Sequence, residues 1–253
     1  MPVPSLLAVF AHPDDESLMA GGTLARHAAS GARTAVVTAT WAPDTPRAAE
    51  LAEALRILGA GKPHLLGYAD SRVPESAPGR PRLCDAPLDE AVGDLVARIR
   101  DFRPEIVVSH DAYGGLTGHE DHVHTHRVTL SAVHAAGLER LYPDAGDPWQ
   151  PSALYLSTHP HSAVREWGGH WAPTGKALRT VPDDRVTAAI DVTPWLDRKI
   201  AAVLAHRTEV ARGAAPGLIA ALPSAERERL LGTEWYIRHD LVAPAPVETE
   251  LRP

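Results

Sequence analysis

Short apolar segments alternate with amphipathic segments along most of the chain, and this alternation limits its fold more than any other feature. Segments of strand character occupy residues 6–10, 34–40, 63–66, 106–109 and 153–157. Apolar side chains spaced three or four apart predict helices at residues 16–30, 46–58, 88–102 and 120–136. Alternation of this kind is typical of βαβ units, whose right-handed crossovers build a parallel sheet. We therefore predict an α/β fold with a mostly parallel sheet.

The rest of the chain is less regular, and we expect it to belong to the same domain. Loops rich in proline and polar residues are predicted at residues 74–87, 142–151 and 173–184, and a late helix at residues 195–210. With 253 residues, 44% of them hydrophobic, the chain can form one sizeable core. We expect a single domain over residues 1–242, with a smaller irregular C-terminal part. Residues 243–253 have the composition of a disordered tail.

Composition argues against several classes of partner. The net charge is −7 and no basic block occurs, which argues against nucleic acid. No stretch approaches the ~20 apolar residues of a membrane span, and the N-terminal apolar run lacks the basic flank of a signal peptide. The single cysteine, Cys84, rules out an intrachain disulfide and fits a reducing compartment. We expect a cytoplasmic protein with no membrane partner, either a monomer or a homo-oligomer.

The first predicted strand ends in a cluster of ionisable residues. His12, Pro13, Asp14 and Asp15 lie just beyond it. Residues after a parallel strand lie at the carboxyl edge of the sheet, where α/β proteins bind ligands, and Pro13 holds them in a defined turn. An imidazole and a carboxylate three residues apart can bind one divalent ion, which leaves the second carboxylate as a base. The alternative is a turn in which Asp14 or Asp15 caps the next helix.

A second cluster follows the fourth predicted strand and a glycine-rich loop. It contains His119, Asp121, His122 and His126. Two strands that each deliver histidine and aspartate beyond their C-terminal ends predict a three-ligand zinc site with one open position. His126 lies one helical turn beyond His122, but no H-E-x-x-H arrangement is present. We therefore expect His126 to pack or to form a hydrogen bond.

Five segments carry a family resemblance in the same order along the chain. An A-H-P-D-D-E motif occupies residues 11–16, and an H-x-D-H motif occupies residues 119–122. The other three segments are residues 47–59, residues 66–71 and the D…K-x-x-A-x-x-x-H pattern of residues 191–206. Together they resemble the LmbE-like or PIG-L family of zinc-dependent N-deacetylases. The chain departs from this family at Glu120, where proline is usual, and at residues 207–209, where a small residue and glutamine are usual.

The resemblance implies a Rossmann-like three-layer fold with the strand order 3-2-1-4-5. Strands one and four are neighbours in that order, so His12 and Asp15 would lie beside His122. The resemblance also implies that these three residues bind Zn²⁺, with water in the fourth position, and Fe²⁺ is an alternative metal. An exchange of roles, with His119 as the third ligand and His122 as its support, stays open.

The catalytic roles implied by the resemblance belong to three further residues. Asp14 would take a proton from the attacking water and return it to the departing amine as general base and acid. His119 would orient or protonate the tetrahedral intermediate. Asp121 would support one of the histidines.

Three residues are expected to bind the substrate, and each has a simpler structural alternative. Arg47 would grip sugar oxygens, or it would form a surface pair with Glu50. Asp70 would accept hydrogen bonds from sugar hydroxyls, or it would begin a turn. His206 would lie near the site, or it would occupy a helix surface.

We expect a hydrolase that removes the acetyl group from an N-acetylglucosamine-type amino sugar or glycoconjugate. The resemblance also includes deacetylases and amidases of the mycothiol pathway, and these are the alternative. Thr117 stands where the deacetylases of the mycothiol precursor have tyrosine, and Met19 stands where the conjugate amidases tend to have lysine. An alternative of another class is a non-catalytic sugar-binding module, which would require a broken set of ligands. A nucleotide-binding or methyl-transfer domain would require a glycine-rich turn where His12 and Pro13 stand.

Overall fold

The structure is a computed structural model that describes residues 3–171 and 177–242. The predicted tail at residues 243–253, and part of the predicted loop at residues 173–184, lie outside the described residues. The strands are β1 (Leu6–Phe10), β2 (Thr34–Thr40), β3 (Pro63–Tyr68), β4 (Ile106–His110), β5 (Ala153–Thr158), β6 (Ala188–Asp191) and β7 (Thr233–Asp240).

These strands form one sheet with the order β3-β2-β1-β4-β5-β7-β6. Strands β1 to β5 are parallel, and β7 runs antiparallel to both β5 and β6. The predicted α/β fold and the predicted order of the first five strands are therefore confirmed. Strands β6 and β7 were not predicted from the sequence, because β6 has four residues and β7 is largely polar and only partly buried.

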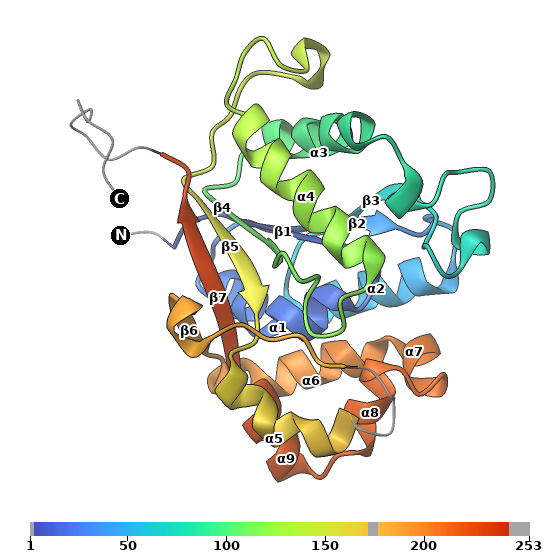
Figure 1. Ribbon diagram of the computed structural model, residues 1–253, viewed down its shortest axis with the longest axis vertical. Helices are drawn as coiled ribbons and strands as arrows, with labels where there is room; N and C mark the ends of the chain where they lie inside the picture. Colours follow the sequence, from blue (N-terminus) through green and yellow to red (C-terminus); the bar gives the residue numbers. More distant parts are fainter. Residues whose placement is uncertain (1–2, 172–176, 243–253) are drawn as a thin grey trace.

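Helices cover both faces of the sheet, which makes the predicted three layers (Figure 1). One face carries α1 (Asp15–Ala29), α2 (Pro46–Leu58) and α6 (Leu196–Ala205), and the other carries α3 (Leu88–Phe102) and α4 (Glu120–Ala135). Alternate residues of β1 serve the two cores. Leu6 and Phe10 pack toward α1 and α2, whereas Leu7 and Val9 pack toward α3 and α4. This burial on both faces explains why the parallel strands are uninterrupted apolar runs.

The C-terminal part packs at the carboxyl end of the strands (Figure 1). It contains α5 (His161–Trp171), α7 (Arg207–Ala211), α8 (Ala215–Ala221) and α9 (Ser224–Leu231). The prediction of one helix over residues 195–210 is wrong, because α6 ends at Ala205 and α7 begins at Arg207. Glu50 fixes this break by accepting hydrogen bonds from the backbone nitrogen and the hydroxyl of Thr208. Within residues 3–171 and 177–242, no helix is long and apolar enough to cross a membrane.

Candidate metal centre and catalytic site

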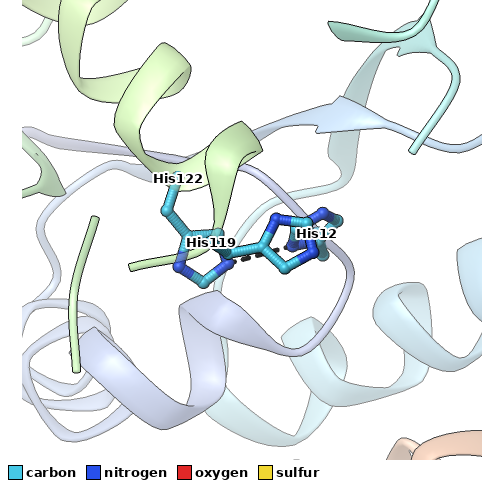
Figure 2. Close-up of side chains that lie close together, drawn as sticks. All are labelled: His12, His119 and His122. Atoms are coloured by element: carbon cyan, nitrogen blue, oxygen red, sulfur yellow. Dashed lines mark hydrogen bonds between the residues drawn. The ribbon is translucent and has the colours of Figure 1, made fainter. Parts of the chain in front are cut away.

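The turn after β1 and the first turn of α4 meet at the carboxyl edge of the sheet. Because β1 and β4 pair in parallel, the segments that leave these strands begin side by side. His12 lies in the turn after β1, Asp15 begins α1, and His122 lies in the first turn of α4. Figure 2 shows the rings of His12, His119 and His122 close together. The topology thus assembles residues that are more than a hundred positions apart in the sequence.

Three side-chain atoms form a triangle that fits one tetrahedral metal ion. His12 Nδ1 lies 3.0 Å from His122 Nε2 and 3.4 Å from Asp15 Oδ2, and the last two atoms are 3.3 Å apart. Tetrahedral zinc with bonds of roughly 2.0–2.1 Å requires ligand atoms about 3.3 Å apart. Imidazole nitrogen and carboxylate oxygen are also donors that zinc accepts. Both the spacing and the chemistry of this metal triangle (His12, Asp15 and His122) therefore suit such an ion.

Each imidazole of the metal triangle has its other ring nitrogen occupied by the protein. His122 Nδ1 lies 3.1 Å from the carbonyl oxygen of Gly114, and His12 Nε2 lies 3.1 Å from Asp121 Oδ2. With a metal ion bound and both rings neutral, these nitrogens would carry the ring protons and donate, which would leave a lone pair on each nitrogen that faces the triangle. Gly114 has a φ of 74°, and a Cβ there would come within 2.8 Å of Val123 Cγ2, so this loop requires glycine.

The surroundings of His12 contain an excess of buried negative charge. Asp15 and Asp70 are each 5% exposed and Asp121 is 0% exposed, and Asp121 Oδ1 has no hydrogen-bond partner. Burial alone would lower the pKa of His12, but hydrogen bonds to Asp121 and Asp15 outweigh it and raise the pKa to about 10. A position that holds a proton this firmly favours positive charge, which a divalent ion would supply.

His119 stands beside the metal triangle as the N-cap of α4. Its Nδ1 accepts a hydrogen bond from the Asp121 amide at 3.2 Å. Ligand nitrogens of His12, His119 and His122 lie within 4.8 Å of one another, so the geometry leaves open the exchange of His119 and His122. Burial, then the neighbouring histidines, lower the pKa of His119 to about 4, so the ring is neutral near pH 7.

Asp14 lines the cavity beside the metal triangle and has a strained backbone. Its φ of 135° lies in a region that non-glycine residues seldom adopt, at a strain of roughly 1–3 kcal/mol. Asp14 occupies the N-cap position of α1, but its side chain makes no capping hydrogen bond, which excludes the capping alternative for this residue. Burial raises the pKa of its carboxyl to about 7, against the lowering effect of Arg47.

Arg47 reaches the site from α2 and pairs with two carboxylates. Its Nη2 lies 3.3 Å from Asp14 Oδ1, and its Nη1 lies 3.3 Å from Glu209 Oε1. The alternative pair with Glu50 is not formed, since the Glu50 carboxylate accepts hydrogen bonds from Thr208. Arg47 thus faces the cavity already paired with protein groups.

Asp70 and His206 differ in their access to the cavity. Asp70 Oδ1 accepts a hydrogen bond from the Arg72 amide at 2.8 Å, and its Oδ2 lies 3.4 Å from His12 Nε2, so Asp70 both shapes a turn and lines the cavity. His206 is 0% exposed and its Nε2 lies 3.0 Å from Glu16 Oε1. His206 therefore lies near the site, where Glu16 links it to the amide of Asp14, but it does not line the cavity.

Two further residues belong to this site. His110 ends β4 with 0% exposure, its Nε2 lies 3.4 Å from Asp15 Oδ2, and its ring stacks on His122 with centroids 4.0 Å apart. Glu209 lines the cavity, whose volume is about 210 Å³. The signals for them were a histidine at a strand end and the departure at residues 207–209. His126 packs as predicted, since its Nδ1 lies 3.0 Å from the carbonyl oxygen of His110 and donates a hydrogen bond to it.

Comparison with known proteins decides the family. Residues 7–133 match PIG-L, described as GlcNAc-PI de-N-acetylase. The 1D-myo-inositol 2-acetamido-2-deoxy-α-D-glucopyranoside deacetylase of Rhodococcus opacus (strain B4) is 39% identical over 277 aligned positions, which cover 96% of this chain and 89% of that protein. This chain belongs to the PIG-L family. It is a deacetylase, an enzyme that hydrolyses an amide bond.

Solved structures share the fold of this PIG-L protein over nearly its whole length. A conserved protein from Thermus thermophilus is 27% identical with a TM-score of 0.64, over 98% of this chain and 100% of that one. The N,N'-diacetylchitobiose deacetylase of Pyrococcus horikoshii is 19% identical with a TM-score of 0.64, over 94% of this chain and 84% of that one. At its lower identity, the second likeness shows the fold alone.

Proposed function

We propose that this PIG-L protein uses Zn²⁺, held by His12, Asp15 and His122, to remove the acetyl group from an N-acetylglucosamine-type sugar. The observation that carries the proposal is the metal triangle, whose edges of 3.0, 3.3 and 3.4 Å match a tetrahedral ion. Fe²⁺ has similar ligand preferences and is the second candidate metal. The zinc assignment agrees with the buried negative charge around His12.

The acid–base chemistry falls to Asp14. When bound, zinc would act as a Lewis acid that polarises the acetamide carbonyl and lowers the pKa of water. The Asp14 carboxylate takes one proton from the attacking water and later gives it to the nitrogen of the departing amine, so that water and amide become acetic acid and amine. A pKa raised to about 7 by burial suits a group that both accepts and returns a proton near neutral pH.

His119 and Asp121 support this reaction in different ways. His119 lines the cavity, and its Nδ1 is occupied by the Asp121 amide, so Nε2 is the nitrogen that carries the proton. From Nε2 it donates to the oxygen that becomes negative as the water adds. Asp121 Oδ2 accepts from His12 Nε2 and fixes the orientation of that ring.

The relatives indicate the first substrate to test. Deacetylases of 1D-myo-inositol 2-acetamido-2-deoxy-α-D-glucopyranoside align with 96% of this chain, and we propose this glycoside as the leading substrate. Asp70, which lines the cavity, would accept hydrogen bonds from sugar hydroxyls. Thr117 also lines the cavity, at the position where the deacetylases of the mycothiol precursor have tyrosine. This difference favours a second candidate, another N-acetylated amino-sugar glycoside.

Acetate release by the purified protein tests the proposal. The panel contains 1D-myo-inositol 2-acetamido-2-deoxy-α-D-glucopyranoside, N-acetylglucosamine, N,N'-diacetylchitobiose and an N-acetylated antibiotic pseudoaglycone. Metal content is measured on the same samples, and we expect one zinc per chain with acetate release from at least one sugar. Full zinc content without acetate release from any N-acetyl sugar would refute the proposed substrate class. Activity that is the same with and without bound metal would refute the metal assignment.

A further inference from the structure

We infer that Asp111 is a positioning residue for the metal ligand His122. It acts by orienting the peptide group that joins Gly114 to Gly115. Asp111 begins the β4–α4 loop (residues 111–119), which connects the strand and the helix on either side of the site. The inference rests on the proposed function, in which His122 binds zinc. It assigns part of the zinc affinity to a residue outside the metal triangle.

Both oxygens of the Asp111 carboxylate accept hydrogen bonds inside the protein. Oδ1 accepts from the amide of Tyr113 at 3.1 Å and from the amide of Gly115 at 2.9 Å. Oδ2 accepts from the hydroxyl of Thr158, the last residue of β5, at 2.6 Å. Asp111 is 4% exposed and does not line the cavity, so it acts on the site only through its neighbours.

The amide that binds Asp111 belongs to the same peptide group as the carbonyl that binds His122. A peptide group is planar and almost always trans, so its N–H and its carbonyl point in opposite directions. The N–H of Gly115 points to Asp111 Oδ1. The carbonyl of Gly114 therefore points away from Asp111, and its oxygen lies 3.1 Å from His122 Nδ1. Asp111 and His122 thus bind the two ends of one rigid group.

This peptide group needs an anchor because glycine lies on both sides of it. Gly114 has a φ of 74° and Gly115 a φ of 63°, both in the left-handed region. Glycine adopts positive and negative φ about equally well, so the two residues allow the peptide group between them to turn over. A reversed peptide would direct its N–H at His122 Nδ1 and remove the acceptor that fixes the ring. The Asp111 carboxylate opposes this reversal, because the hydrogen bond from Gly115 would be lost.

Strand β5 fixes Asp111 in turn. The amide of Asp111 donates to the carbonyl oxygen of Ser157 at 3.2 Å, so the main chain and the side chain of Asp111 both bind β5. Ser157 and Thr158 are 2% and 1% exposed, so water does not compete for these contacts. A carboxylate is also a stronger acceptor than a neutral group, and more so when buried. His122 is thereby connected to β5 through Asp111 and one peptide group.

Asp111→Ala provides the first test, with zinc affinity as the measurement. Each metal-free protein is titrated with zinc against a chelator of known affinity, well below its melting temperature. We expect the dissociation constant for zinc to rise about 10–100-fold, the usual cost of removing a residue that orients a metal ligand. A merely structural role would lower the melting temperature of the metal-free protein and leave the zinc affinity of the folded protein unchanged. That second result would overturn the inference.

Asp191→Ala is the matched control for Asp111→Ala. Asp191 Oδ1 also accepts a backbone hydrogen bond, from the amide of Thr193 at 2.9 Å, but Asp191 is exposed and does not line the cavity. Its variant should bind zinc as the unsubstituted protein does. An equal loss of zinc affinity in both alanine variants would overturn the inference, because the effect would then not depend on the β4–α4 loop.

Asp111→Asn separates the hydrogen bonds from the charge. Asparagine has nearly the same shape, its carbonyl oxygen can accept from both amides, and its NH₂ group can donate to the hydroxyl of Thr158. We expect its zinc dissociation constant to stay within about fivefold of that of the unsubstituted protein, since neutral acceptors form somewhat weaker hydrogen bonds. A loss as large as in Asp111→Ala would show that negative charge, and not the orientation of the peptide group, supports the metal. The inference would then be wrong.

Thr158→Val tests the connection to β5 and also serves if Asp111→Ala does not fold. Valine is similar in shape but lacks the hydroxyl that donates to Asp111. We expect the zinc dissociation constant to rise about 2–10-fold, and not to rise further when Thr158→Val is added to Asp111→Ala, because both act through one peptide group. Thr129→Val is the control, since the buried Thr129 hydroxyl lies 3.1 Å from Ser109 Oγ instead. Unchanged affinity in Thr158→Val, or losses that multiply in the double variant, would overturn this connection.

The same titration separates failure of the inference from failure of the proposed function. The unsubstituted protein is measured beside His122→Ala, and we expect His122→Ala to lose tight zinc binding. Equal zinc affinity of these two proteins would refute the metal triangle itself. Tight binding that is lost in His122→Ala but unchanged in Asp111→Ala would refute only the positioning role of Asp111.

Discussion

At the scale of single residues, two adjacent carboxylates are placed in environments that separate their chemistry. Burial would raise the pKa of Asp15, but His122 and His110 outweigh it and hold that pKa well below its usual value. Burial raises the pKa of Asp14 to about 7, because Arg47 opposes it only in part. A carboxylate that stays ionised suits a metal ligand, and one that titrates near neutrality suits proton transfer. The strained backbone lies at Asp14 itself, so the two adjacent carboxylates take up different environments.

Asp14→Asn should therefore retain the metal and lose the reaction. Asparagine has nearly the same shape, and the proposed ligands are unchanged, but it cannot take a proton from water. We expect acetate release to fall about 10²–10⁴-fold, the usual contribution of a general base, with zinc content unchanged. Asp147→Asn, a change in an exposed pair with Arg103, is the control. Turnover near that of the unsubstituted protein, at full zinc content, would exclude Asp14 as the base.

Thr117 and His119 should differ sharply in their effect on catalysis. Thr117 lines the cavity, but its side chain is much shorter than the tyrosine expected from the family resemblance, so it can reach the oxyanion only through water. We expect Thr117→Ala to change kcat by less than about threefold, and His119→Ala to lower it about 10²–10³-fold, as for loss of an oxyanion donor. Steady-state kinetics on the best substrate measures both. A severe loss from Thr117→Ala would reverse this division of roles.

At the scale of secondary-structure elements, the sequence predicts the strands and helices that follow from local patterns of apolar residues. It does not predict the contacts that depend on how distant elements pack. The apolar runs predict β1, which is followed by His12, and β4, which is followed by the loop before His122. This is possible because the periods of strands and helices are local features of the sequence. The family order then makes the two strands neighbours. The ionic contacts of Arg47 with Glu209 carry no such signal, because they depend on how the C-terminal part packs against α2. The break between α6 and α7 was missed for the same reason. Its contacts reach distant elements: His206 contacts Glu16 in α1, and Thr208 donates to Glu50 in α2.

Lys199→Met should destabilise the contact among α1, α6 and β7. Lys199 Nζ lies 2.8 Å from Glu234 Oε1, and Glu234 also accepts from the amides of Gly22 and Thr23 in α1. Lys199 and Glu234 are 2% and 3% exposed, so removing the lysine leaves a buried charge without its partner. We expect the free energy of unfolding to fall by roughly 3–5 kcal/mol in urea denaturation.

The control for Lys199→Met is Lys62→Met, because Lys62 is exposed. It should change the free energy of unfolding by less than about 0.5 kcal/mol. Adding Glu234→Gln to Lys199→Met should restore part of the loss, since the unpaired charge is then gone. A change of less than about 1 kcal/mol in Lys199→Met alone would show that the pair contributes little net stability.

At the scale of the whole molecule, the site is built where two parts of the chain meet. The sheet and its first helices provide His12, Asp15 and His122, and the C-terminal part closes the same cavity with Glu209 and Ile219. Ligand pockets form preferentially at the carboxyl edge of parallel sheets and where two parts of a protein meet. A metal ion at this edge would therefore join β1, α1 and α4 through its ligands, so its binding should be measurable as stability of the entire fold.

Removal of the metal should lower the melting temperature, and zinc should restore it. A ligand that binds only the folded state stabilises it by about 4 kcal/mol at 1,000 times its dissociation constant, which corresponds to roughly 10 °C for a chain of this size. Chelator-treated protein is melted with and without added zinc, beside His122→Ala and His134→Ala. His134 lies exposed in the last turn of the same helix, so its variant should keep the response. His122→Ala should lose the response, because one corner of the metal triangle is gone. The same zinc-dependent rise in His122→Ala as in His134→Ala would assign the metal to other ligands.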